Sequence, residues 1–306
     1  MSENTIYITG HKNPDSDSIC SAIGYAALKG EGYAAGRAGV VNPESQFVLD
    51  YFKLEAPTLL DNVAGQEIIL VDHNEFGQAV DGIQDAKILE ILDHHRIGGI
   101  TTSEPILFCN MPVGCTATIV NMFYEKAGKK PEPKIAGVLC SAILSDTLAF
   151  RSPTCTPLDK KTATELAAIA GISDIEAYAK DMFVAGSNLG AKTEKEILYL
   201  DFKKFNVGDK TFGVGQVTSM SGEELQGLKP KMQAYMKESF AEHGVDMLFF
   251  MLTDIMDEST DLIFCGEGAE AVVNSAFTSD ADDRVYLKGV MSRKKQIVPQ
   301  ITEALK

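Results

Sequence analysis

The stretch His11-Lys12-Asn13-Pro14-Asp15-Ser16-Asp17 decides the fold prediction, because it joins an apolar strand to an amphipathic helix. The strand is expected over residues 5–9, a β-branched apolar run that stops at Gly10. The helix is expected to follow Asp17, with its apolar residues on one face, and to end at Gly30. One imidazole and two carboxylates thus lie on a loop at the carboxyl end of a strand, where open α/β sheets collect their active sites.

A simpler interpretation of this stretch is a turn followed by an Asp that caps the helix. That interpretation explains one Asp, but neither His11 nor the second Asp. Pro14 restricts the loop, so its side chains can converge at a smaller entropic cost. Neutral imidazole and carboxylate oxygens suit divalent metals such as Mn²⁺, Co²⁺ or Zn²⁺. The stretch therefore predicts a metal site.

The composition limits the classes of partner. The chain has 306 residues, 45% of them hydrophobic, and a formal net charge of −15. This length predicts one or two domains with a sizeable core. The negative charge argues against a nucleic-acid or membrane-surface partner, because both require a basic face. A small anionic substrate would need metal ions or a local cluster of Lys and Arg.

The cysteines and the N-terminus predict a cytoplasmic protein. The six Cys residues form no C-x-x-C pair and are interpreted as reduced and mostly buried. Residues 1–4 are polar, and the apolar run after them is too short for a signal peptide. No apolar stretch approaches the roughly 18 residues that a membrane span needs.

Three further apolar runs repeat the pattern of the first one. Residues 67–72 end at Asp72, residues 87–92 lead into Asp93-His94-His95, and residues 105–109 precede a glycine turn. Residues 32–39 are expected to form a loop, and helices are expected over 46–52, 116–127, 133–143, 159–170 and 174–184. This alternation predicts an α/β fold with a doubly wound, mainly parallel sheet.

A second, smaller domain of mixed α/β type is expected after a Gly- and Ser-containing break at residues 187–194. We expect a first domain over 1–186 and a second over 195–306. The second domain should contain a hairpin of residues 199–205 and 211–217, a helix over 221–243, strands at 246–253, 260–265 and 286–290, and a terminal helix near Pro299.

Eight candidate ligands lie at the carboxyl ends of predicted elements: His11, Asp15, Asp17, Asp72, Asp93, His94, His95 and Asp146. His73 and His243 are interpreted as ordinary buried or surface residues. A set rich in Asp, with a few His, suits two divalent ions that share a carboxylate, and such a pair can activate water and clamp a phosphoryl group. The set predicts metal-assisted hydrolysis of a phosphoric anhydride or ester.

A basic cluster in the second domain complements these acidic residues. It comprises Arg293-Lys294-Lys295, with Lys203-Lys204 in the predicted hairpin. A short charged run is commonly a solvated face. In a chain of this negative charge, however, the two basic runs are candidates for holding phosphate oxygens.

The ordered motifs resemble those of the DHH phosphoesterase superfamily. Asp93-His94-His95 follows a strand, and His11-x-x-x-Asp15-x-Asp17 lies upstream. Within the superfamily, the chain resembles the family II (manganese-dependent) soluble inorganic pyrophosphatases through four segments: Val71-Asp72-His73-Asn74-Glu75, Val113-Gly114-Cys115-Thr116-Ala117-Thr118-Ile119, Ser145-Asp146-Thr147 and Ser292-Arg293-Lys294-Lys295-Gln296. The match covers residues 5–302 without a large insertion, so a regulatory CBS-domain insert is not expected.

The resemblance implies two Mn²⁺ (or Co²⁺) ions per subunit. It assigns His11, Asp15 and Asp72 to one ion, and Asp17, Asp72, His94 and Asp146 to the other, with Asp72 bridging. It places His95 outside the metal shell and facing the substrate, with Asp93 orienting a His or the nucleophile. A DHHA2-type second domain would hold phosphate oxygens through Lys203, Arg293 and Lys294. Lys204 is adjacent to Lys203, and a shift of one residue would exchange their faces of the strand.

The resemblance also implies the reaction and the assembly. A metal-bridging hydroxide would attack pyrophosphate in line, without a covalent intermediate, in a cleft between the domains. Mg²⁺ would accompany the substrate, and a homodimer is expected. The alternatives are a DHH exonuclease or cyclic-dinucleotide phosphodiesterase, an exopolyphosphatase, and a non-catalytic metal- or phosphate-binding regulator. The chain lacks the Gly-Gly-Gly-His motif typical of the first class and lacks Trp for stacking on bases.

Overall fold

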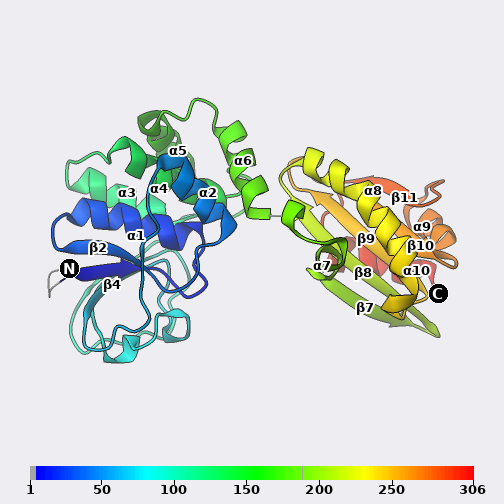
Figure 1. Cartoon of the computed structure of the whole chain (residues 1–306), viewed down its shortest axis with the longest axis horizontal. Coiled ribbons are helices and arrows are strands. Elements are labelled where there is room, and N and C mark those ends of the chain that lie inside the picture. Colours follow the sequence, from blue (N-terminus) through cyan, green and yellow to red (C-terminus); the bar gives the residue numbers. More distant parts are fainter. Residues whose placement is uncertain (1–4, 188) are drawn as a thin grey trace. The chain divides into compact units, whose positions relative to one another are not determined.

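The computed structural model describes residues 5–187 and 189–306. Two predictions, the polar start at residues 1–4 and Asn188 in the expected linker, lie outside the described residues. The chain divides into two compact units, Met1–Gly186 and Ser187–Lys306 (Figure 1). Each unit has its own sheet and its own apolar core.

The first unit is built on a six-stranded sheet in the order β3-β2-β1-β4-β5-β6. Every pair of neighbouring strands is parallel, as the sequence predicts. The strands are β1 (Ile6–Thr9), β2 (Tyr33–Arg37), β3 (Thr58–Leu59), β4 (Glu67–Val71), β5 (Lys87–Asp93) and β6 (Leu107–Asn110). The strand order reverses direction between β1 and β4, so the carboxyl ends of these two strands flank the crevice where such sheets bind ligands.

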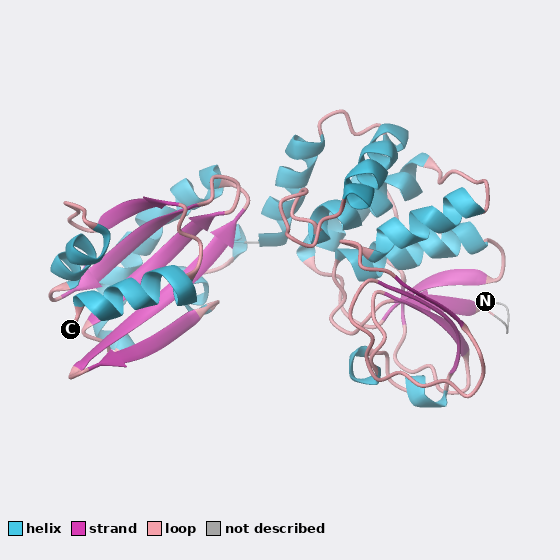
Figure 2. Ribbon diagram, turned by 180° about the vertical axis from the view of Figure 1, so that it is seen from behind, coloured by secondary structure: helices cyan, strands magenta, loops and turns pink. Residues whose placement is uncertain are grey.

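The two faces of this sheet are covered differently (Figure 2). One face carries α-helices, which are α1 (Ser16–Lys29), α2 (Pro43–Phe52), α3 (Thr116–Lys126), α4 (Pro133–Asp146), α5 (Pro157–Ala170) and α6 (Ile175–Ser187). The other face is covered by the connections around β4 and β5, which contain the short turns η1 (Phe76–Gln78) and η2 (Ile83–Asp85). Ile68, Leu70, Val80 and Ile83 are buried together there.

The prediction of a loop over residues 32–39 was wrong. Residues 33–37 form β2, in which Ala35 pairs with Ile8 of β1. The segment Tyr33-Ala34-Ala35-Gly36-Arg37 has small residues and no β-branched side chain. Its extended conformation comes from backbone pairing with β1 and β3, which a local propensity does not reveal.

The second unit holds a five-stranded sheet in the order β11-β10-β9-β8-β7. Only β8 and β9 pair in parallel, and the remaining pairs are antiparallel. The strands are β7 (Phe202–Val207), β8 (Lys210–Ser219), β9 (Met247–Asp254), β10 (Ser259–Gly266) and β11 (Arg284–Lys288). α8 (Gly222–Ser239) packs on one face, whereas α9 (Ala269–Phe277), η5 (Arg293–Ile297) and α10 (Val298–Ala304) pack on the other.

Several boundaries in the second unit differ from the prediction, and the last strand spans 284–288 instead of 286–290. Tyr199 ends α7 (Glu194–Tyr199) and does not begin the hairpin, whose first strand starts at Phe202. Thr193 and Glu196 form a reciprocal capping box that starts α7 inside the expected linker. The predicted helix over 221–243 ends at Ser239 and continues as the turn η4 (Phe240–His243).

Among the described residues, no helix combines the length and the apolar character needed to cross a bilayer. Three of the six free cysteines are buried, and the other three, Cys109, Cys155 and Cys265, are partly exposed.

Candidate active site

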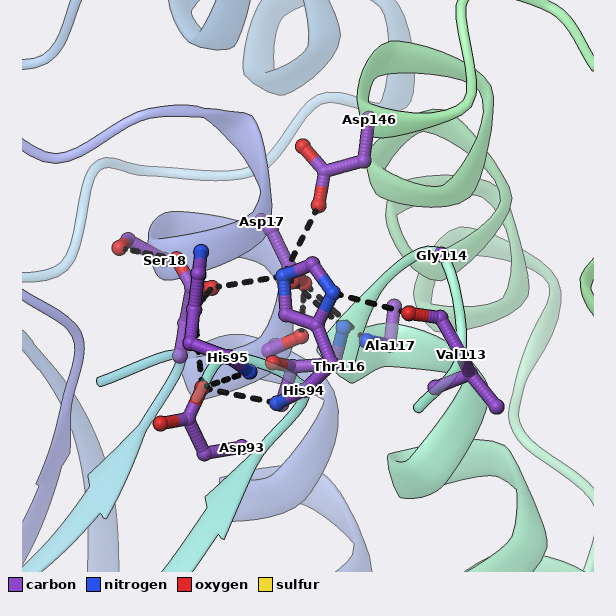
Figure 3. Close-up of polar contacts among 12 residues, drawn as sticks. Asp17, Ser18, Asp93, His94, His95, Val113, Gly114, Thr116, Ala117 and Asp146 are labelled. Atoms are coloured by element: carbon purple, nitrogen blue, oxygen red, sulfur yellow. Dashed lines mark hydrogen bonds and ion pairs between the residues drawn. The ribbon is translucent and has the colours of Figure 1, made fainter. Parts of the chain in front are cut away.

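The acidic and histidine residues singled out in the sequence meet at the switch point of the parallel sheet. His11 follows β1, Asp72 follows β4, and Asp93 ends β5. The start of α1 supplies Asp17 and the end of α4 supplies Asp146 (Figure 3). Side chains more than a hundred residues apart in sequence therefore converge on one edge of the sheet.

Asp72 lies at the centre of the cluster and presents one oxygen to each half of it. Its Oδ2 atom lies 3.3 Å from His11 Nε2 and accepts a hydrogen bond of 2.7 Å from Ser18 Oγ. Its Oδ1 atom lies 3.5 Å from His94 Nε2. The side chain is only 1% exposed. A carboxylate with this arrangement can bridge two ions.

The first half of the cluster consists of His11, Asp15 and Asp72. His11 Nε2 lies 3.4 Å from Asp15 Oδ2, and His11 Nδ1 lies 2.7 Å from the Lys12 carbonyl oxygen. Donation from Nδ1 to that carbonyl leaves Nε2 as the ring atom that faces the carboxylates and can bind an ion once it loses its proton. Asp15 also caps α1, because its other oxygen accepts from the Ser18 backbone N–H. Helix capping and ligand geometry therefore coexist in Asp15.

The second half is arranged around His94. Its Nε2 atom lies 3.8 Å from Asp17 Oδ2, 3.7 Å from Asp146 Oδ2 and 3.5 Å from Asp72 Oδ1. Its Nδ1 atom lies 3.1 Å from the Val113 carbonyl oxygen, so this ring also has one nitrogen held by the backbone. Three carboxylate oxygens thus face one imidazole nitrogen.

A loop at residues 113–117 orients both Asp17 and His94, and the motif that contains it was not predicted to position ligands. Asp17 accepts hydrogen bonds from the backbone N–H groups of Thr116 at 2.6 Å and Ala117 at 3.1 Å, at the start of α3. The Val113 carbonyl from the same loop holds His94. The sequence marked this loop only by the glycine turn at Gly114. Its supporting role depends on hydrogen bonds to Asp17, which lies 100 residues before Ala117 in the chain.

Asp93 and His95 form a separate pair beside the cluster. Asp93 is fully buried, and its Oδ1 atom lies 3.0 Å from His95 Nδ1. The His95 side chain is 54% exposed, and its Nδ1 atom is 3.7 Å from Asp72 Oδ1. His95 is thus near enough to join Asp72 and His94 as a ligand, but it is the most accessible of the three histidines in the cluster.

Two further histidines, His73 and His243, and the cysteine Cys115 were not among the ligands expected from the sequence. His73 is buried with its Nδ1 atom 2.9 Å from the Val71 carbonyl, and it belongs to no candidate ligand group among the described residues. His243 is satisfied by the hydroxyls of Tyr199 and Ser239. Cys115, one of the cysteines interpreted as reduced and mostly buried, lies within ligand range of Asp17 and Asp146.

The protonation of the cluster reflects its crowded negative charge. Burial would lower the pKa of His11, but the carboxylates of Asp15 and Asp72 outweigh it and raise that pKa to about 11. The pKa of His94 rises to about 9, against the effect of burial, because of Asp72 and Asp17. Burial and the charge of Asp72 raise the pKa of Asp17 to about 6. Without cations, protons must compensate the carboxylates, and divalent ions would compensate them better.

The backbone is strained next to several of these ligands. Asp72 itself has a φ of 62°, and Asn13, between His11 and Asp15, has a φ of 55°. Leu148, Ala149 and Phe150, just after Asp146, also have positive φ values. Residues other than glycine pay about 1–2 kcal/mol each for this conformation, and such strain concentrates at functional sites.

The basic residues lie in the second unit. Lys203 shares its face of β7 with Phe205, which packs against the apolar cluster that contains Ile297 of η5. Lys204 lies beside Gly244 on the opposite face. Lys203 is therefore on the face that carries Arg293 and Lys294. Lys203 and Lys294 are exposed.

Arg293 is held within this unit. It is 8% exposed, and its guanidinium donates to the carboxylate of Asp201 at 2.8 Å and to the Asp201 carbonyl. It also donates to the Val214 carbonyl at 3.4 Å. These contacts fix the orientation of the guanidinium before any anion arrives.

The fold and the site define a class of protein. A parallel sheet whose switch point gathers at least four carboxylates and two imidazoles, with one carboxylate shared, matches the donor set of two hard or borderline divalent ions. The site is that of a metal-dependent enzyme of two α/β domains.

Comparison with known proteins identifies the family. Residues 5–143 match the DHH family N-terminal domain, and residues 180–304 match the DHHA2 domain. The chain is 49% identical to a Clostridium acetobutylicum protein named "Probable manganese-dependent inorganic pyrophosphatase", over 99% of both chains. It is 43% identical to the manganese-dependent inorganic pyrophosphatase of Bacillus subtilis, over 98% of both chains.

A solved structure agrees with these relatives. A Methanococcus jannaschii protein assigned to the family II inorganic pyrophosphatases superposes with a TM-score of 0.63 at 41% identity, covering 98% of this chain and 99% of that one. The chain belongs to the family of manganese-dependent (family II) inorganic pyrophosphatases, as its motifs predict.

Proposed function

We propose that this protein hydrolyses inorganic pyrophosphate to two phosphates at a site for two divalent ions. The observation that carries the proposal is the position of Asp72, whose two oxygens face His11 and His94 separately. Relatives that match nearly the whole chain carry the name of this activity.

The donor set supports two ions, with Mn²⁺ or Co²⁺ the proposed occupants. His11, Asp15 and Asp72 would hold one ion, and Asp17, Asp72, His94 and Asp146 the other. When bound, such ions lower the pKa of a shared water and offset the charge of the phosphates. Mg²⁺ is proposed to arrive with the substrate.

The other residues have roles that do not involve holding an ion. Asp93 fixes the ring of His95 through Nδ1, which leaves Nε2 of this half-exposed imidazole available to a substrate oxygen. Lys203, Arg293 and Lys294 would neutralise phosphate oxygens. Arg supplies a planar fork for two oxygens, and Lys supplies a point charge. Direct in-line attack by hydroxide, without a covalent intermediate, remains the proposed course of the reaction.

A homodimer is proposed as the working assembly. β6 is an edge strand of the first sheet, and its Leu107 and Phe108 are 43% and 41% exposed. An edge strand with exposed apolar side chains is a natural site for pairing with another chain. Sedimentation of the wild type and of Phe108→Lys would test this, with a dimer expected for the first and dissociation for the second. The cytoplasmic location stays a prediction.

The decisive experiment measures phosphate release after separate incubation with Mn²⁺, Co²⁺, Zn²⁺ or Mg²⁺. Pyrophosphate, short polyphosphate and a single-stranded oligonucleotide serve as parallel substrates. We expect pyrophosphate to be cleaved fastest after Mn²⁺ or Co²⁺, and chelation to abolish the activity. Cleavage of polyphosphate or the oligonucleotide alone would contradict the proposed substrate, and no cleavage of any substrate would favour a binding protein.

A further inference from the structure

Glu44, near the start of α2, forms side-chain hydrogen bonds to two other helices of the first unit. It lies in the first turn of α2, where an acidic residue is favoured by the helix dipole and commonly faces water. Here the side chain turns inward and is partly buried. Its Oε1 atom accepts a hydrogen bond of 2.6 Å from Ser16 Oγ and one of 2.5 Å from Ser145 Oγ. One carboxylate oxygen therefore joins the start of α1 to the end of α4.

Both serines adjoin candidate metal ligands. Ser16 precedes Asp17, and Ser145 precedes Asp146. Asp17 and Asp146 both face His94 Nε2, at 3.8 and 3.7 Å. Glu44 thus links the two chain segments that bring carboxylates to the same proposed ion. Elsewhere α1 and α4 are packed by apolar side chains such as Leu139, which lies against Gly24, and such packing does not fix the distance between two polar groups to a fraction of an ångström.

Gly186 confines Glu44 from the other side. A Cβ atom at Gly186 would lie 2.9 Å from the Cβ atom of Glu44 and 3.1 Å from its Oε2 atom. The last turn of α6 therefore passes so close that no side chain fits between them. Glycine inside a helix costs about 1 kcal/mol relative to alanine, and this close approach explains its presence here.

We propose that Glu44 is a positioning residue that sets the separation of Asp17 and Asp146, and that Gly186 keeps it in place. The inference rests on the proposed two-ion function. Glu44 does not itself contact the ion, the substrate or the water. Its effect passes through the two serine hydroxyls, so an acceptor at the same place should suffice even without the negative charge.

The test compares Glu44→Ala with Glu44→Gln by titration with Mn²⁺, following free Mn²⁺ by electron paramagnetic resonance. Glu44→Ala should lower the binding affinity for one of the two ions by about 10–100-fold, the range typical when a contact that supports a metal ligand is lost. Glu44→Gln keeps an Oε1 acceptor and should restore affinity close to the wild-type value. The visible spectrum of the Co²⁺-loaded protein should change in Glu44→Ala and recover in Glu44→Gln.

Controls separate positioning from folding. Glu90 is a partly buried carboxylate of the same unit that accepts from Tyr25 and Lys29 near the far end of α1. Glu90→Ala should leave both ion affinities unchanged. Gly186→Ala should reproduce part of the Glu44→Ala defect. If Glu44→Ala does not fold, the double variant Ser16→Ala, Ser145→Ala gives the same test.

The outcomes are distinct. Wild-type affinity for both ions in Glu44→Ala, or a defect in Glu44→Gln as large as in Glu44→Ala, would overturn the positioning role and leave the proposed function intact. A wild-type protein that binds fewer than two ions would overturn the two-ion function and this inference with it.

Discussion

The Asp93 carboxylate holds His95 by both its backbone and its ring. Asp93 Oδ1 accepts from the backbone N–H of His95 at 3.1 Å and lies 3.0 Å from Nδ1 of the same residue. The largest effect on the His95 pKa is this hydrogen bond, which raises it. A buried carboxylate thus fixes both the tautomer and the direction of a half-exposed imidazole.

Removing the charge of Asp93 should therefore impair turnover more than metal binding. We expect Asp93→Asn to lower kcat by about 10–100-fold, because the ring of His95 loses its fixed tautomer. Manganese content should stay near two ions per chain. His95→Gln should cost a similar factor, and the double variant should cost little more than either single variant. Additive losses would show that Asp93 acts on something other than His95.

The proposed bridging role of Asp72 predicts a large effect on metal content. Asp72→Ala removes the one carboxylate shared by both halves of the cluster. Both ions should therefore be lost, or their binding affinity should fall by at least about 100-fold. Equilibrium dialysis followed by metal analysis measures this directly. Equal metal content in the wild type and in Asp72→Ala would refute the bridging assignment. Lys294→Ala is the matched comparison, and it should retain both ions while binding substrate more weakly.

The two neighbouring lysines of β7 offer a sharp test of substrate binding. Lys203 is on the face of Arg293, and Lys204 is on the opposite face beside Gly244. Lys203→Ala should raise KM for pyrophosphate by about 10-fold or more, as expected for a lost charged hydrogen bond. Lys204→Ala should leave KM unchanged. A larger effect at Lys204 would mean that the opposite face of β7 meets the substrate.

Metal binding should release protons and should weaken as the pH falls. Without ions, the pKa is about 11 for His11 and about 9 for His94, so at pH 7 both rings are positively charged, with a proton on each nitrogen. A ring that binds an ion through Nε2 must lose that proton, so raising the pH favours binding, by up to about tenfold per pH unit for each proton displaced. Calorimetry of Mn²⁺ binding in two buffers with different ionisation enthalpies measures the released protons. Binding without proton release would contradict these imidazoles as ligands.

Gly114 allows the loop that supports Asp17 and His94 to pack closely. A Cβ atom there would lie 2.8 Å from Thr147 Cγ2 and 2.9 Å from Asp159 Oδ2. Gly114→Ala should destabilise the protein by about 1–3 kcal/mol and weaken metal binding, because the loop must shift. Gly77→Ala is the control, since a Cβ at Gly77 meets no atom within 4 Å. Thermal melting and Mn²⁺ titration of both variants provide the comparison.

The sequence predicted the parallel sheet because its strands are apolar runs that end at polar residues. The run at residues 5–9 became β1 (Ile6–Thr9), and the expected stop at Gly30 follows the last residue of α1. β2 was missed because Ala34, Ala35 and Gly36 have no strand preference, and their conformation depends on pairing with β1. Tyr199 was assigned to a strand because its apolar neighbours suit either element, and the capping box at Thr193 decides for a helix.

Within the site, the sequence identified side chains better than it identified their supports. The candidate ligands are charged or imidazole groups at the ends of strands and helices, a pattern visible in one dimension. Their supports are Ser18, the Val113 carbonyl, the N–H groups of α3, and Glu44. These are ordinary polar groups whose contribution depends on long-range contacts, so no local pattern marks them.

All candidate metal ligands lie before residue 147, and the basic residues proposed to hold phosphate oxygens, Lys203, Arg293 and Lys294, all lie after residue 202. The two stretches fall in different compact units, each with a separate core. Mutations that reshape the recognition of the anion can therefore accumulate in one unit without disturbing the packing that holds the ions in the other. A lineage with this layout can exchange one substrate for another while inheriting the same metal chemistry.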